Sequence, residues 1–367
     1  MAMAYEGIGS AVNPGNQGSD LPDLQSKTIA LGQLFSQEFF FRVPEYQRPF
    51  RWNDDNLTDL VDDLLLAPRD REYFLGTLVL HQRDDGTYDL VDGQQRLTAL
   101  CILLACVRDA PSLSDDSKFR SEIHEKILQP AKELDNVPER NRVQVRDQKM
   151  FNRLIATVGG TLEHAPIDES ETPSERRYLV ARDIFAKALS DFTEEELREF
   201  ASFISQKCVL IYVATTSFDD AFRLFTIVND RGEQLRRIDI LKADNLSPTV
   251  VANDASRSRY AQQWEEMEER LGESRFEDIF HHLRLIYVQD KPQADLHKEF
   301  QSRVFGKPNM PKPGRDFLDS LSEYVDLYDS IFVARDWLEA TEDHARYSTL
   351  MAAMVGHFGA SEWKACL

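Results

Sequence analysis

A short polar motif, Asp92-Gly93-Gln94-Gln95-Arg96, follows an apolar strand-like segment and precedes an apolar helix-like one. A turn of this kind presents free backbone N–H groups and the positive end of a helix dipole, which together favour a bound anion. Gly93 would let a phosphate approach the main chain, and the two glutamines would offer amide donors. Arg96 could hold phosphate oxygens through two parallel hydrogen bonds, and Asp92 could hold a metal ion or orient water. The motif predicts a phosphate site.

The same five residues also permit a purely structural interpretation. Asp92 would be the N-cap of a helix, Gln95 would occupy the third helical position, and Arg96 would point into solvent. The motif alone does not decide between a phosphate site and a capped helix.

A second segment combines cations with aromatic rings. Three arginines, Arg42, Arg48 and Arg51, lie within ten residues. Three aromatic residues lie among them or directly after them: Tyr46, Phe50 and Trp52. Guanidinium groups hold phosphates and aromatic faces stack on bases, so the segment suits a nucleotide or a nucleic acid. The alternative is an ordinary loop whose aromatic residues fill the core. The net charge of -20 requires that any contact with DNA come from such a local basic cluster.

A third segment carries an apolar stripe, Phe218, Phe222 and Phe225, ahead of Asn229-Asp230-Arg231-Gly232. This pattern predicts a helix that ends at Gly232, the residue type preferred at a left-handed helix end. Asn229 and Arg231 could also reach back to a phosphate or a metal ion.

Several function classes are excluded on motif grounds. The chain has no G-x-x-x-x-G-K-[ST] phosphate loop, no H-E-x-x-H zinc motif and no evident His-Asn-His nuclease set. Its four cysteines show no C-x-x-C spacing, which fits a reducing compartment. No apolar run approaches the ~20 residues of a membrane span. We therefore expect a soluble, cytoplasmic protein that does not bind membranes.

The elements that must position these residues are readable from periodicity. We expect a helix over 29–35, a strand over 39–43 ended by Pro44, and a helix capped by Asn53. Strands over 77–82 and 88–91 should form a hairpin, with a helix after Gly93. Further strands are expected at 143–145 and 209–213, and helices from 256 onward. The fold class is α+β, a small mixed core followed by a largely helical body.

The three segments together are far more specific than any one. In this order, V-P-E-Y-Q-R-P-F-R-W, L-V-D-G-Q-Q-R-L-T-A-L and F-x-x-x-N-D-R-G-E-x-L-x-x-x-D-I-L-K resemble the GmrSD-type family with a D-G-Q-Q-R motif, from about Thr28 to Leu246. The resemblance implies a ParB/sulfiredoxin-like core whose motif binds and hydrolyses nucleoside triphosphates. It implies a disordered leader over 1–27, a nucleotide-binding domain over 28–250 and a helical extension over 251–367.

The resemblance also implies roles for individual residues. The expected catalytic residues are Asp92, Gln95 and Arg96. The expected nucleotide-binding residues are Gln47, Arg48, Gly93, Gln94, Thr98, Asn229 and Arg231. A surface that senses DNA modification is expected at Pro44, Tyr46 and Arg51. GTP or another triphosphate is the expected substrate, Mg²⁺ would suit it, and no protein ligands for a metal are identified.

Many members of this family cut phage DNA that carries modified bases or a phosphorothioate backbone. Their nuclease is usually a separate His-Asn-His domain, C-terminal to this module or in a partner. Because the chain stops inside a helical pattern, we expect a truncated protein, and a homo-oligomer is compatible with it. Two alternatives stay open: a non-hydrolysing module that binds nucleotide or DNA and regulates a nuclease, or a ParB-like centre that is itself a nuclease.

Overall fold

The structure is a computed structural model. It describes residues 24–113, 118–135, 137–163, 171–228, 236–247, 249–336, 343–358 and 362–366. The principal strands and helices of the N-terminal part are β1 (Leu24–Ala30), α1 (Leu31–Leu34), β2 (Phe41–Arg42), α2 (Asp54–Leu66), β3 (Tyr73–Gln82), β4 (Tyr88–Asp92), α3 (Gln94–Asp109), α4 (Lys118–Ile127), β5 (Leu128–Gln129), β6 (Arg140–Asn141), β7 (Val143–Gln144), α5 (Gln148–Phe151), α6 (Pro173–Ala188), α7 (Glu194–Gln206) and β8 (Cys208–Thr215). The helices that follow are α8 (Phe218–Val228), α9 (Arg237–Asn245), α10 (Asp254–Leu271), α11 (Glu273–Val288), α12 (Leu296–Glu299), α13 (Arg315–Tyr328) and α14 (His344–His357).

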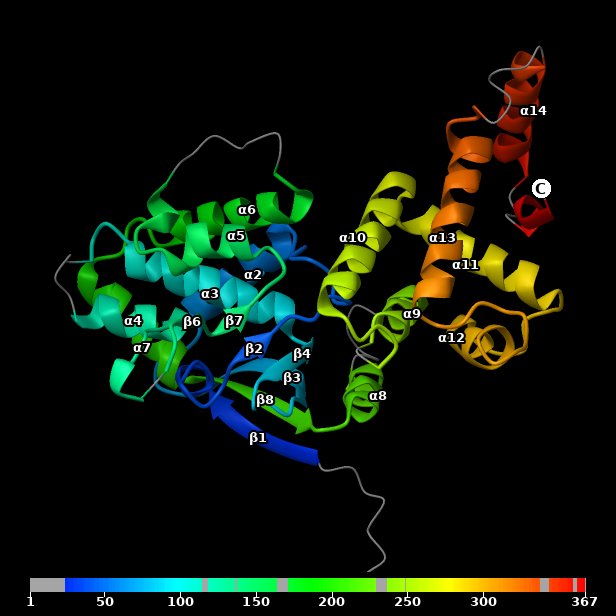
Figure 1. Cartoon of the computed structure of the whole chain (residues 1–367). Coiled ribbons are helices and arrows are strands. Elements are labelled where there is room, and N and C mark those ends of the chain that lie inside the picture. Colours follow the sequence, from blue (N-terminus) through cyan, green and yellow to red (C-terminus); the bar gives the residue numbers. More distant parts are fainter. Residues whose placement is uncertain are drawn as a thin grey trace, which may run out of the picture.

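A six-stranded mixed sheet with the order β1-β8-β3-β4-β2-β7 forms the base of the N-terminal part. The pairs β1/β8 and β3/β4 are antiparallel, whereas β8/β3, β4/β2 and β2/β7 are parallel. Figure 1 shows helices α2 to α7 on one side of this sheet, with α9 to α14 extending away from it as a separate helical body. The expected α+β class, with a mixed core and a largely helical body, is confirmed.

The central hairpin is buried on both faces, which follows from its continuous apolar runs, because successive side chains of a strand point to opposite faces. Leu78, Leu80 and Leu90 belong to the large core beneath α2 to α7. On the opposite face, Val79 and Val91 pack against α8 in a smaller cluster. The hairpin is thereby fixed between two layers, and so is the end of β4, from which the D-G-Q-Q-R turn departs.

Most of the elements expected from periodicity are present. The helix after Asn53 has the expected cap, because the Asn53 side chain accepts a hydrogen bond from the backbone N–H of Asn56. The hairpin and the strand near 209–213 are confirmed as β3, β4 and β8. Among the described residues, no helix combines the length and apolar character needed to cross a membrane.

Two expectations near the N-terminus are wrong. The segment 29–35 is not one helix, because residues 29 and 30 end strand β1 and only Leu31–Leu34 is helical. The register Ile29↔Leu210 and Ala30↔Val209 shows the cause: pairing with β8 overrides the local helical pattern. The same strand begins at Leu24, so residues 24–27 are paired in the sheet and not part of a disordered leader.

Candidate functional site

The D-G-Q-Q-R turn begins where β4 ends at Asp92, and Gly93 is the N-cap of α3. Gly93 has φ 93°, a backbone conformation that a side chain would strain. A Cβ built on Gly93 would lie 2.2 Å from Leu78 Cδ2. The glycine is therefore required by the fold and by packing against the hairpin. The phosphate approach expected at Gly93 stays a prediction. No side chain caps α3, so Asp92 is not the N-cap either.

Both glutamines of the motif hold the loop of residues 43–53, called here the arginine loop. Gln94 Nε2 donates to the carbonyl of Arg48 at 2.9 Å, and Gln95 Nε2 donates to that of Pro49 at 2.9 Å. Gln95 Oε1 in turn accepts from the backbone N–H of Arg51 at 2.8 Å. A carboxamide can donate to one backbone group and accept from another in this way, which neither an ionised carboxylate nor a guanidinium can do.

A third glutamine completes the attachment of the arginine loop. Gln47 Nε2 donates to the carbonyl of Val91 at 2.7 Å. The backbone positions of Arg48 and Arg51 are therefore set by the motif. Thr98, one turn into α3, is 3% exposed and lies behind the loop, beside Pro49 and Phe50.

Arg96 and Asp92 lie on another side of the turn. The Arg96 guanidinium rests against Gly76 of β3, since a Cβ on Gly76 would lie 2.8 Å from Arg96 Nη1. Burial lowers the pKa of Arg96, and the charge of Asp92 offsets this only in part. Burial also raises the pKa of Asp92. Arg96 is therefore partly buried, where the structural interpretation of the motif had placed it in solvent.

Arg96 differs from the neighbouring arginines in its partners. Arg42 pairs with Asp89, Arg48 with Asp239, and Arg51 with Glu273. Within the described part of the chain, Arg96 makes neither a hydrogen bond nor an ion pair. A desolvated cation without a counter-ion is energetically costly, so this position favours an anionic ligand.

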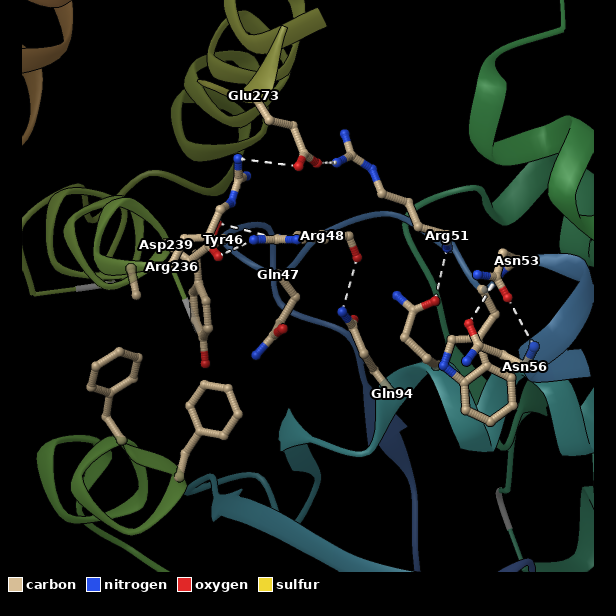
Figure 2. Close-up of a pocket in the computed structure, with 15 residues that line it drawn as sticks. Tyr46, Gln47, Arg48, Arg51, Asn53, Asn56, Gln94, Arg236, Asp239 and Glu273 are labelled. Atoms are coloured by element: carbon tan, nitrogen blue, oxygen red, sulfur yellow. Dashed lines mark hydrogen bonds and ion pairs between the residues drawn. The ribbon is translucent and has the colours of Figure 1, made fainter. Parts of the chain in front are cut away.

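A cavity of about 450 Å³ opens beside Gln94 and Gln95, between the arginine loop and the helical body. Its size is within the range of small-ligand sites. Figure 2 shows its lining, which is Tyr46, Gln47, Arg48, Arg51, Trp52, Asn53, Asn56, Gln94, Gln95, Phe222, Phe225, Arg236, Asp239, Ala243 and Glu273. Cations, carboxamides and aromatic rings thus share one space, and Asp92, Gly93 and Arg96 are not on its wall.

The helical body contributes charged residues to this cavity, and of these only Asp239 is a specified residue of a segment quoted in the sequence analysis, as the Asp of D-I-L-K. Arg48 Nε donates to Asp239 Oδ1 at 3.3 Å, and Arg48 also forms an ion pair with that carboxylate. Burial lowers the pKa of Arg48, but the charge and hydrogen bonds of Asp239 outweigh burial and raise it. Arg51 Nη1 lies 3.3 Å from Glu273, and Arg236 pairs with Glu268.

The residues expected to sense DNA modification are not on one surface. Pro44 is buried, and Tyr46 is 6% exposed within the core of the helical body. The Tyr46 ring meets Phe218 edge-on at 5.6 Å, and its hydroxyl has no hydrogen-bond partner among the described residues. Arg51 is exposed. Asn229 and Arg231 lie outside the described residues.

The sequence analysis identified no protein ligands for a metal, and this stays a prediction. Among the described residues, no group of three or more His, Cys, Asp or Glu side chains could hold a metal ion. A magnesium ion would therefore depend on triphosphate oxygens and water for most of its ligands.

Comparison with known proteins places this geometry in a family. A family model described as GmrSD restriction endonuclease, N-terminal domain, matches residues 31–246, which is more than half of the 367-residue chain. The match includes the D-G-Q-Q-R turn, the arginine loop and α9, and it ends before α10. No curated protein matches the chain.

Proposed function

The chain belongs to the family of GmrSD restriction endonuclease N-terminal domains, and we propose that it is the nucleoside triphosphatase and sensor module of a modification-dependent restriction protein. Membership in this family implies a restriction-type defence protein that acts on DNA together with a nuclease domain. Within this framework the module would hydrolyse GTP or another triphosphate at the D-G-Q-Q-R turn. Hydrolysis would be coupled to the recognition of modified phage DNA.

One observation carries the nucleotide proposal: the partly buried Arg96 has no protein partner in the described chain, although it lies in the family motif. The free N–H groups at the start of α3 add a second attraction for a phosphate at the same turn. Asp92 lies beside it as a carboxylate whose pKa burial raises, which suits a group that accepts a proton from attacking water. Asp92 is the residue that would hold a Mg²⁺ ion at this turn, and the ion would supply neutralisation of phosphate charge.

The cavity supplies a place for the part of the nucleotide beyond the phosphate at Arg96, namely its further phosphates and its base. Its polar wall carries Arg48 and Arg51, and its remaining wall includes the half-buried ring of Trp52. Aromatic stacking accepts any base, which agrees with a site that does not depend on one particular triphosphate.

The proposed contact with DNA is through the arginine loop. Arg51 is the member of the expected sensing set that a duplex can reach in this state, whereas Pro44 and Tyr46 are buried. Contact between Tyr46 and a modified backbone would require the arginine loop to move away from the helical body. A duplex would meet a local positive group there despite the net charge of -20.

The test is phosphate release from each triphosphate, with and without plain, base-modified and phosphorothioate duplexes, together with nicking of a plasmid. Arg96→Ala should lower turnover ~100-fold or more, because a positioned cation contributes several kcal/mol to a phosphoryl transition state. Arg71→Ala, which removes an exposed arginine, is the matched control. Equal turnover by the Arg96→Ala and wild-type proteins would refute the proposal. Binding without turnover would favour a regulatory module, and nicking would favour a nuclease.

A further inference from the structure

The cavity beside the motif is closed on one side by a set of ion pairs, called here the charged seam. Two of its members, Arg48 and Arg51, come from the arginine loop. The others are Arg236 just before α9, Asp239 on α9, Glu268 at the end of α10 and Glu273 at the start of α11. Figure 2 shows Glu273 between the guanidinium groups of Arg51 and Arg236, and Asp239 facing Arg48. Arg236 and Asp239 lie within the family match, which ends at residue 246, whereas Glu268 and Glu273 follow it. The seam therefore joins the family domain to α10 and α11.

The seam uses the same side chains that would meet a ligand. Arg48 and Arg51 line the cavity together with their acceptors Asp239 and Glu273. A phosphate group carries more negative charge than one carboxylate and accepts several hydrogen bonds from a guanidinium. A phosphate-bearing ligand in the cavity must therefore compete with the helical body for these two arginines.

The outer pair is the easier one to exchange. The side chains of Arg51 and Glu273 are 39% and 61% exposed, and pairs of this kind contribute little to stability. Those of Arg48 and Asp239 are 32% and 9% exposed, so removing Arg48 leaves a buried carboxylate that depends on Arg236 at 3.6 Å. The order of exchange would therefore be Arg51 first and Arg48 second.

The two sides of the seam are not equally free to move. Hydrogen bonds from Gln94, Gln95 and Gln47 fix the backbone of the arginine loop to the motif. On the other side, Glu273 is the first residue of α11 and follows Gly272, whose φ is 78°. The start of α11 is thus the part that can respond when the arginines turn toward a ligand.

A separate set of contacts keeps the helical body attached. Arg146 and Lys242 both pair with Glu265 in the middle of α10, and Arg146 also donates to the carbonyl of Gln47 at 3.1 Å. Lys242 is 2% exposed, and the side chains of Arg146 and Glu265 are 17% and 20% exposed. None of the three lines the cavity. Exchange at the seam would loosen one end of the helical body without detaching it.

We propose that the charged seam couples ligand occupancy to the helical body: phosphates in the cavity take Arg51, and then Arg48, from Glu273 and Asp239, and this frees the start of α11. The inference rests on the proposed function, since it requires that the cavity bind a phosphate-bearing ligand. It adds a route by which binding at the D-G-Q-Q-R turn reaches the residues that follow the family domain.

The test compares the affinity of the full chain for GTP and for inorganic tripolyphosphate in wild type and in the Glu273→Gln variant. Because Glu273 competes with the ligand for Arg51, its removal should raise affinity about two- to fivefold, the range expected for an exposed ion pair. A purely structural role for Glu273 would lower affinity or leave it unchanged. Glu269→Gln removes the same charge from an exposed position on α10 that makes no ion pair in the described chain, so it controls for net charge.

Hydrogen exchange supplies the second readout. Ligand should increase exchange at residues 273–279 of the wild-type protein and leave residues 262–266, around the Glu265 anchor, unchanged. In Glu273→Gln, exchange at 273–279 should be raised before ligand is added, and ligand should add nothing. Failure of the wild type to bind either ligand would overturn the proposed function and this inference together. Binding without a gain in affinity over Glu269→Gln, or without the exchange change, would overturn the inference alone.

Discussion

Gly76→Ala is the sharpest test of the role of Arg96, because it disturbs that guanidinium without altering the motif. Gly76 lies inside β3 at φ 113°, where the pairing of β3 with β8 shifts register between Phe74 and Thr77. The guanidinium of Arg96 occupies the space that a side chain at Gly76 would need. A glycine inside a strand often marks such a close approach.

The magnitude follows from the distances. A Cβ at Gly76 would lie 2.8 Å from Arg96 Nη1, and ordinary contact begins at 3.4 Å, so the guanidinium must move by about 0.6 Å (3.4 minus 2.8). Misplacement by ~1 Å at a catalytic group can cost ~100-fold in rate. We expect Gly76→Ala to lower triphosphate turnover roughly 10- to 100-fold, less than the loss in Arg96→Ala.

The assay is steady-state phosphate release, with thermal unfolding measured on the same preparations. Gly86→Ala is the control, because Gly86 also has a positive φ, 78°, but nothing lies within 4 Å of its added Cβ. Both variants carry the strain of a left-handed residue, about 1–2 kcal/mol, and only Gly76→Ala displaces Arg96. If the two variants lose turnover equally at equal folded fraction, the guanidinium niche has no role in catalysis and the reasoning is refuted.

Two further substitutions in the motif have distinct expected outcomes. Gly93→Val should destabilise the fold by about 2–4 kcal/mol, because the valine side chain would meet Leu78 and its backbone would be held in a left-handed conformation. Urea unfolding would measure this loss. Unchanged stability with lost nucleotide affinity would instead support direct contact of Gly93 with phosphate. Asp92→Asn should lower turnover ~100-fold or more if Asp92 is the base, yet stabilise the protein at neutral pH. Burial raises the folded pKa of Asp92 above its ordinary 3.8, so stability falls as pH rises between the two values, and a thermal scan against pH that shows no gain for Asn would contradict this.

Local sequence was sufficient for the elements on which the site stands. The Asn53 cap, the β3–β4 hairpin and the helix after Gly93 are all encoded by neighbouring residues, and the structure contains each of them. The helix expected over 29–35 failed for the opposite reason. Its first residues are held in β1 by pairing with β8, a partner about 180 residues away (210 minus 29) that no local pattern reveals.

The site itself could be predicted only in part. The motif identified the turn, but the targets of Gln94 and Gln95 are backbone groups of another loop, and side-chain direction is a tertiary property. The acceptors Asp239 and Glu273 are far from the arginine loop in sequence. Asp239 is the first residue of D-I-L-K in the third quoted segment, but that segment does not mark it as a partner of an arginine, and nothing marks Glu273. Gly76 did carry a usable signal, since a glycine inside an apolar strand suggests close approach by another group.

The acidic composition of the chain explains why the arginines around the cavity are paired with carboxylates. With 63 acidic against 43 basic residues, an arginine at the surface has many carboxylates available. The arginines that line the cavity, Arg48, Arg51 and Arg236, each form an ion pair with a carboxylate. Such an arginine can bind an anionic ligand only if the ligand replaces its carboxylate partner. It therefore responds to the charge of the ligand but binds an anion weakly. Arg96 is not paired in this way. Its guanidinium lies against the backbone of Gly76, and no described carboxylate forms an ion pair with it. The motif therefore bears on two kinds of cation. Arg96 makes no ion pair among the described residues and is the proposed partner for phosphate, whereas Gln94 and Gln95 position the loop whose arginines are paired with carboxylates.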